Sequence, residues 1–191
     1  MRRARDRILF DPSLVLCVTP HVKGDTVETL RSIFGTTDNV LMLALSDLTD
    51  ETARRRSRGQ EGPSVAWTVG HLLDHRFKVL RLLRVDRESP YAAKFGDTAA
   101  TDGADYPTLA DFRQQWADVL AELEEAFANA AADLLERSLS DAGAHGETRL
   151  RDKLAFYAWH EGYHMGAIGA ARKAFGLPGP AELVVAASRT G

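Results

Sequence analysis

The sequence has 191 residues, a length that accommodates one domain and is too short for two well-buried ones. Its 24 lysines and arginines against 27 aspartates and glutamates give a formal net charge of −3, which excludes the basic surplus that binding to nucleic acid or an anionic membrane requires. Its apolar stretches fall well short of the roughly 20 residues of a membrane-spanning helix. We therefore expect neither a nucleic-acid partner nor a membrane partner.

The chain has a single cysteine, Cys17. One thiol can form neither an internal disulfide nor a cluster of thiolate zinc ligands, and this cysteine usage is typical of a reducing compartment. The sequence therefore predicts a cytoplasmic protein.

Apolar residues recur at spacings of three and four in four long windows, whereas the alternation typical of strands never extends beyond a few residues. The first window covers about residues 25–54. The second begins after Ser64, which is a helix-capping residue type, and reaches about Val85. The third runs from about residue 107 to residue 135, and the fourth from about residue 147 to Phe175, where the Gly/Pro-rich segment 176–180 ends it. The chain is therefore predicted to be all-α.

The lengths of the connections constrain the topology. The first and second helices, and the third and fourth, are joined by about ten residues, whereas residues 86–106 form a polar stretch of about twenty. At about 3.3 Å per residue this stretch can run the length of a 30 Å helix, which makes the second and third helices parallel. The sequence predicts an up-down-down-up four-helix bundle over residues 25–180, preceded by an N-terminal extension (1–24) and followed by a C-terminal tail (181–191).

Four of the six histidines form two pairs with the same spacing: His71 and His75 in the second helix, and His160 and His164 in the fourth. A spacing of four places both rings of a pair on one face of a helix. In the fourth helix this face also carries apolar residues, so the rings are predicted to point into the bundle. A buried imidazole needs partners for both nitrogens, and a metal ion is an effective one.

A bland alternative is that each ring donates to a backbone carbonyl or borders solvent. Histidines on two facing helices favour a divalent metal, because bundles build metal sites in this way, and zinc, nickel or ferrous iron suits imidazole ligands. The apolar arc of the second helix is centred between Val69 and Leu72. His75 lies nearer to this arc than His71, so periodicity slightly favours His75 as the ligand from this helix.

Three segments resemble the DinB/YfiT-like superfamily: residues 63–73, with Trp67 before His71; residues 160–169, with the pair His160 and His164; and residues 172–179, with Gly-Leu-Pro. The resemblance covers roughly residues 25–180. It implies a four-helix bundle, often dimeric, in which three histidines bind a divalent metal, commonly zinc or nickel. By that resemblance the ligands are His71, His160 and His164, with His75 as a substitute for His71 or a neighbour of the site.

Residues 160–164 also spell His-Glu-x-x-His, in which the glutamate of a zinc protease acts as the general base. No third histidine follows at the required spacing, and no sheet is predicted that could orient a peptide. The protease interpretation is therefore disfavoured. Glu161 lies about 100° around the helix from His160, which leaves two alternatives: it faces solvent, the favoured interpretation, or it acts as a general base.

The resemblance implies a metal-dependent enzyme, because the family members of assigned function use a metal to lower the pKa of a small thiol, such as bacillithiol or mycothiol, for transfer to an electrophile. Metal-dependent hydrolysis is the neighbouring interpretation, and the alternative is a non-catalytic bundle that the metal stabilises. The expected partners are a small-molecule substrate, such as a low-molecular-weight thiol, and a second copy of the chain. Alanines on the third helix favour a homodimer or merely favour helix formation: Ala126, Ala128, Ala130, Ala131 and Ala132.

Overall fold

The computed structural model describes residues 25–57, 59, 61–96, 99–100, 105–140, 143 and 145–189. The N-terminal extension and Cys17 lie outside these residues. The described chain forms α1 (Asp25–Leu45), α2 (Asp50–Arg54), α3 (Val65–Leu82), α4 (Ala92–Phe95), α5 (Leu109–Ala128), α6 (Ala132–Leu135), α7 (Leu150–Ala174) and α8 (Pro180–Ala187). Within it an isolated bridge between Ser138 and Arg149 is the only β-type pairing, so the predicted all-α class is confirmed.

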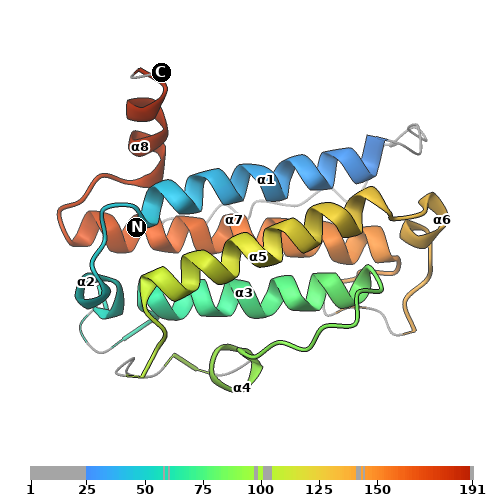
Figure 1. Ribbon diagram of the computed structural model, residues 1–191, viewed down its shortest axis with the longest axis horizontal. Helices are drawn as coiled ribbons and strands as arrows, with labels where there is room; N and C mark the ends of the chain where they lie inside the picture. The colour runs from blue at the N-terminus through green and yellow to red at the C-terminus, as the bar shows by residue number, and fades with distance from the viewer. Residues whose placement is uncertain are drawn as a thin grey trace, which may run out of the picture.

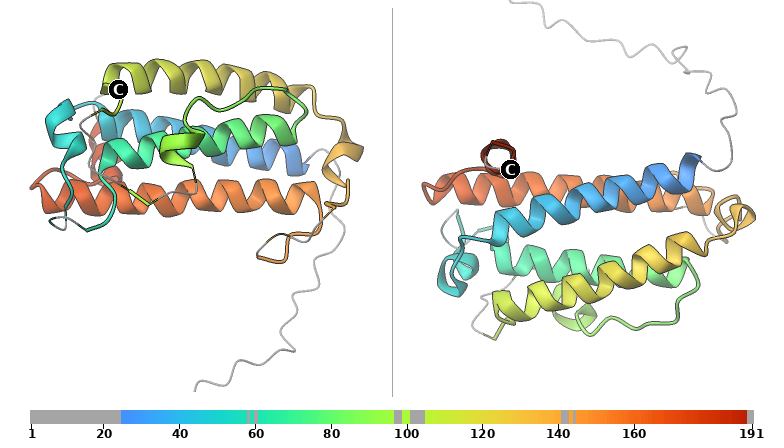
Figure 2. Two further views of the ribbon diagram at one scale, coloured as in Figure 1. Left: turned by 90° about the horizontal axis from the view of Figure 1, so that it is seen from below. Right: turned by 45° about the horizontal axis from the view of Figure 1, so that its top comes forward.

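The four long helices α1, α3, α5 and α7 pack side by side (Figure 1). The end of α1 lies beside the start of α5, where Arg113 donates to the carbonyl oxygen of Leu45. The start of α1 lies beside the end of α5, where Arg31 pairs with Glu124 at 2.5 Å. Helices α3 and α5 start at the same end of the bundle, and α1 and α7 start at the other (Figure 1). The long connection between α3 and α5 carries α4, which packs against α3 (Figure 2).

Local capping sets where the long helices begin. The Ser64 hydroxyl accepts a hydrogen bond from the backbone nitrogen of Trp67 at 3.1 Å, as the sequence predicts. Thr108 and Asp111 form a reciprocal capping box at the start of α5. Both caps satisfy backbone N–H groups in the first turn of the helix, which stabilises the helix start at that residue. Helices α3 and α5 therefore begin within two residues of their predicted starts.

Two predicted helices are shorter than expected. The first window divides into α1 and α2, because Thr49 adopts an extended conformation and caps α2 through the backbone nitrogen of Thr52. The third window divides after Ala128, because Ala131 is extended and starts the separate α6. Ala130 and Ala131 therefore lie beyond α5, and Ala126 is buried in the core. These three alanines do not form an exposed face of α5, so they no longer support the prediction of a homodimer. The homodimer stays a prediction.

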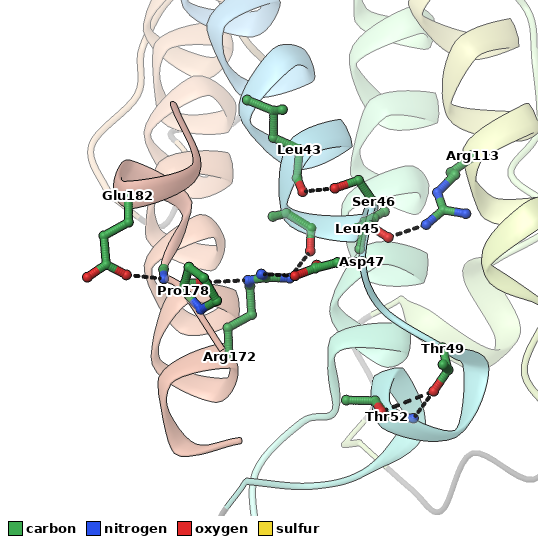
Figure 3. Close-up of polar contacts among 12 residues, drawn as sticks. Leu43, Leu45, Ser46, Asp47, Thr49, Thr52, Arg113, Arg172, Pro178 and Glu182 are labelled. Carbon is green, nitrogen blue, oxygen red and sulfur yellow. Dashed lines mark hydrogen bonds and ion pairs between the residues drawn. The ribbon is translucent and has the colours of Figure 1, made fainter. Parts of the chain in front are cut away.

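The end of the bundle near α8 is held by a buried arginine (Figure 3). Arg172 donates to the carbonyl oxygens of Ala44 and Pro178 at 2.6 and 2.7 Å, and to the two carboxylate oxygens of Asp47 at 2.6 and 2.9 Å. This one side chain joins the end of α7 to the end of α1 and to the turn before α8. The predicted C-terminal tail begins within α8, which packs against α1 and has no fully buried residue.

The core of the bundle is mainly apolar and encloses one group of three charged side chains. Its largest fully buried apolar side chains come from α1, α3, α4 and α5: Leu41, Leu45, Leu72, Leu73, Phe77, Leu80, Phe95, Phe112, Trp116 and Leu123. Asp38, Arg76 and Glu161 are buried within this core. Among the described residues, no helix is both long enough and apolar enough to cross a membrane.

Candidate metal centre

The four paired histidines meet between α3 and α7. His71, His75 and His164 are each 8% exposed, and His160 is half-buried. The ring of His71 lies 4.8 Å from that of His164 and 5.2 Å from that of His160, measured between centroids. The spacing of four puts each pair on one face of its helix, and the packing of α3 against α7 turns these faces toward each other.

The ring of His71 is oriented by the backbone at the end of α4. Its Nδ1 atom lies 2.7 Å from the carbonyl oxygen of Phe95 and 3.2 Å from that of Gly96. A carbonyl oxygen only accepts, so Nδ1 carries the proton and the lone pair of the neutral ring lies on Nε2. That atom is 3.4 Å from Nε2 of His160. A backbone carbonyl on the outer nitrogen is the usual support for a metal-binding histidine.

Close contact between α3 and α4 depends on a glycine. A Cβ atom built on Gly70 would lie 2.6 Å from the ring of Phe95, closer than real Cβ contacts allow. Gly70 therefore lets α4 approach α3 and deliver the Phe95 carbonyl oxygen to His71. On the neighbouring turn, Trp67 stacks on the His71 ring at 4.8 Å with an interplanar angle of 14°.

His160 lies at the centre of the cluster. Its Nε2 atom is 3.1 Å from Nε2 of His164 and 3.4 Å from Nε2 of His71. Two imidazole nitrogens bound to one tetrahedral zinc ion at about 2.05 Å lie about 3.3 Å apart. Both spacings therefore match those between nitrogens that share a zinc ion.

His75 belongs to the cluster in a different way. Its ring stacks almost parallel on that of His160, with centroids 4.3 Å apart and an interplanar angle of 13°. His71, His75 and His160 each offer a nitrogen within 4.8 Å of the others, so three histidines could hold a metal ion. Neither buried ring nitrogen of His75 has a hydrogen-bond partner.

The cluster is electrostatically prepared for a cation. Burial, and to a smaller extent repulsion by the neighbouring imidazoles, lowers the pKa of His75 to about 2 and that of His164 to about 3. The rings of His75 and His164 are therefore neutral at physiological pH and present lone pairs instead of additional protons. Neutral imidazoles gathered in this way, one of them with no hydrogen-bond partner, suit a divalent metal.

Glu161 is not at the surface, contrary to the sequence expectation. It is 2% exposed, and its two carboxylate oxygens accept hydrogen bonds from Arg76 at 2.7 and 2.9 Å. Arg76 also donates to Asp38 at 2.5 Å, and Asp38 accepts from Trp116 at 2.8 Å. Burial raises the pKa of Glu161, and the Arg76 guanidinium opposes that rise. Because both oxygens are bound to Arg76, the carboxylate is not placed to act as the base of a zinc protease.

Sequence reasoning did not find Asp38 or Arg76, although a signal was present. Asp38 lies four residues after Phe34 and three before Leu41, on the apolar stripe of α1. Arg76 lies four residues after Leu72, on the apolar stripe of α3. A charged side chain in such a stripe needs a buried partner of opposite charge, and Glu161 is that partner for Arg76.

Fold and site together define a histidine-rich four-helix bundle with a candidate metal centre between α3 and α7. The family model of the DinB superfamily matches residues 34–168, which is more than half of the chain and includes all four clustered histidines. The protein therefore belongs to the DinB superfamily. No curated protein matches the sequence.

Proposed function

We propose that the protein binds one divalent metal ion, zinc or nickel, through His71, His160 and His164. The orientation of the rings supports this choice over a set that contains His75. The lone pair of an imidazole nitrogen lies in the plane of its ring, so two rings can hold one ion only where their planes meet at it. The planes of His75 and His160 are nearly parallel, whereas His164 is inclined to His160 by 74° and His71 by 57°.

We propose further that this metal centre is catalytic and acts on a small thiol, as a thiol-dependent transferase does. A divalent cation held by three neutral imidazoles keeps an open coordination position and favours the deprotonated form of a bound thiol. The observation that carries the proposal is a cavity of about 170 Å³ that His164 lines, because a small molecule in this cavity would lie against one of the three proposed ligands. A purely structural ion needs no such cavity.

The residues around the proposed metal centre have different roles. His71 is held in one tautomer by the Phe95 carbonyl oxygen, which keeps its Nε2 available to a cation. His160 brings its Nε2 within 3.4 Å of the corresponding atoms of both other ligands. His75 covers one face of His160 and excludes water from it. Arg76 and Glu161 join α3 to α7 one residue away from His75 and His160, which sets the rotation of the two helices.

Metal analysis of the purified protein tests the ligand set. We expect about one zinc or nickel ion per chain, lost in the triple variant His71→Ala/His160→Ala/His164→Ala. The matched control is His75→Phe, which fills the same space and keeps the metal. Loss of metal in His75→Phe, with His164→Ala unaffected, would show that His75 is the third ligand.

A thiol titration of the cobalt-substituted protein tests the catalytic proposal. Adding 2-mercaptoethanol should produce a thiolate-to-metal absorption band that grows as the pH rises, because the thiol loses its proton on binding. The band should be absent in His160→Ala. A cobalt protein that gives no band at any thiol concentration would be a metal-stabilised bundle, the non-catalytic alternative.

A further inference from the structure

Two aromatic side chains on α7 are unusually exposed beside the histidine cluster. Trp159 and Tyr163 are each 61% exposed, and their rings stack at 5.9 Å with an interplanar angle of 28°. The half-buried ring of Phe156 extends the series at 5.9 Å from Trp159. Large aromatic rings left in water are characteristic of binding surfaces, since covering them is favourable.

One end of the aromatic series lies at a cavity that borders the candidate metal centre at His164. Tyr163 and His164 both line the cavity, and the Tyr163 ring stands edge-on to that of His164 at 5.0 Å. Small residues, Gly62, Ala167 and Ala170, form much of the remaining wall. A cavity of about 150 Å³ is known to hold one benzene ring, so 170 Å³ suits a single planar ring. The charged residue of the lining is Glu61, which disfavours an anionic ring.

We propose that the substrate of the metal centre carries a planar ring without a negative charge, which enters this cavity and stacks on Tyr163, with Trp159 extending the stack outward. This inference rests on the proposed function, and it adds the chemical class of the substrate. The cavity favours a small molecule over a second copy of the chain, because it is a concave space of single-ring size that ends at His164. A stable protein interface instead covers about 800 Å² on each partner.

An NMR titration that follows both the ligand and the protein resonances of the metal-free protein tests the ring site without any activity measurement. The probes are benzyl alcohol, which is planar, and cyclohexylmethanol, which has a similar size and a puckered ring. Benzyl alcohol should bind more tightly and should shift the indole N–H resonance of Trp159. Tyr163→Ala should weaken its binding about three- to tenfold, the range expected for loss of one aromatic contact. Tyr163→Phe should bind as the wild type does.

The matched control is Ile33→Ala, which removes an exposed apolar side chain, 43% exposed, from α1. It should leave benzyl alcohol binding unchanged. Equal affinity for the two alcohols, or unchanged affinity in Tyr163→Ala, would overturn the inference. So would sedimentation showing a dimer that Trp159→Ala dissociates, because this face would then bind a second copy.

Zinc titration of the same variants separates this inference from the proposed function. Tyr163→Ala should bind zinc normally, and His160→Ala should lose zinc but keep benzyl alcohol binding. Ring binding without any zinc binding by the wild type would refute the metal centre and leave a ring site. Zinc binding without ring selectivity would refute the ring site and leave the metal centre.

Discussion

The Nδ1 atom of His71 lies 2.7 Å from the carbonyl oxygen of Phe95, although 24 residues separate them in the sequence. This contact determines which nitrogen of His71 faces the other histidines. It joins the connection between α3 and α5 to the candidate metal centre, so a segment without a candidate ligand controls the tautomer of His71. Such outer hydrogen bonds typically change metal affinity by about 10- to 100-fold.

The Gly70→Ala substitution should weaken metal binding. Its Cβ atom would collide with the Phe95 ring and push α4 away, so His71 would lose the carbonyl oxygen that holds its Nδ1 proton. We expect zinc affinity to fall by about tenfold or more in a competition titration with a chromogenic chelator. The matched control is Gly35→Ala in α1, where no atom lies within 4 Å of the new Cβ. It should keep its zinc affinity and gain about 0.5–1 kcal/mol of stability.

The metal-free protein should lose stability in mild acid. The pKa values of His75, about 2, and His164, about 3, lie below the ordinary value of 6.5, so below pH 6.5 the unfolded chain binds protons that the folded chain excludes. Stability from this source is complete above pH 6.5 and declines as the pH falls toward 3. At pH 5 the loss should be about 2 kcal/mol for each of the two histidines.

Urea unfolding in the presence of a chelator, at pH 7.5 and at pH 5, measures this loss. His75→Phe should remove about half of the pH dependence, because phenylalanine cannot be protonated. An unchanged pH dependence in this variant would show that His75 is not a neutral buried ring.

Breaking the pair between Arg76 and Glu161 should destabilise the fold strongly. Both side chains are almost fully buried, so Glu161→Ala removes one of the carboxylates that surround a buried guanidinium. We expect the free energy of unfolding, measured in urea, to fall by about 3–5 kcal/mol. The triple variant Asp38→Asn/Arg76→Met/Glu161→Leu should be less destabilised than Glu161→Ala, because it buries no charge without a partner and keeps an acceptor for the Trp116 indole.

Peptide hydrolysis separates this role of Glu161 from that of a protease base, because the glutamate of a His-Glu-x-x-His site is not a zinc ligand. We expect Glu161→Gln, which keeps the shape of the side chain, to retain zinc. Detectable peptide hydrolysis by the wild type that disappears in Glu161→Gln would contradict the assignment of Glu161 to a buried ion pair.

Removing Arg172 should loosen the end of the bundle. Arg172→Leu leaves the carbonyl oxygens of Ala44 and Pro178 without their donor, which should cost about 1–3 kcal/mol for each buried carbonyl that water does not reach. Asp47→Asn should cost much less, because the Asp47 side chain is 40% exposed. Hydrogen exchange should rise in α8 and at the end of α7 in Arg172→Leu; equal exchange in both variants would contradict the anchoring role.

Much of the fold could be predicted from local sequence patterns. Apolar residues at spacings of three and four indicate the long helices, and Ser64 marks the start of α3, because amphipathic periodicity and capping are properties of neighbouring residues. The breaks after Leu45 and Ala128 could not be predicted. The residues on either side of each break continue the helical pattern, and the backbone at Thr49 and Ala131 turns where the chain must pack against the bundle.

The sequence by itself also determined that two histidine pairs lie on helix faces, because a spacing of four is a local geometric fact. The tertiary structure alone decided what each ring does. Whether His71 or His75 points at the same place as His160 depends on how α3 and α7 are rotated against each other, and His71 is oriented by a carbonyl oxygen from another segment. Glu161 is buried for the same reason: its partner Arg76 is 85 residues away, and only packing brings opposite charges together over that separation.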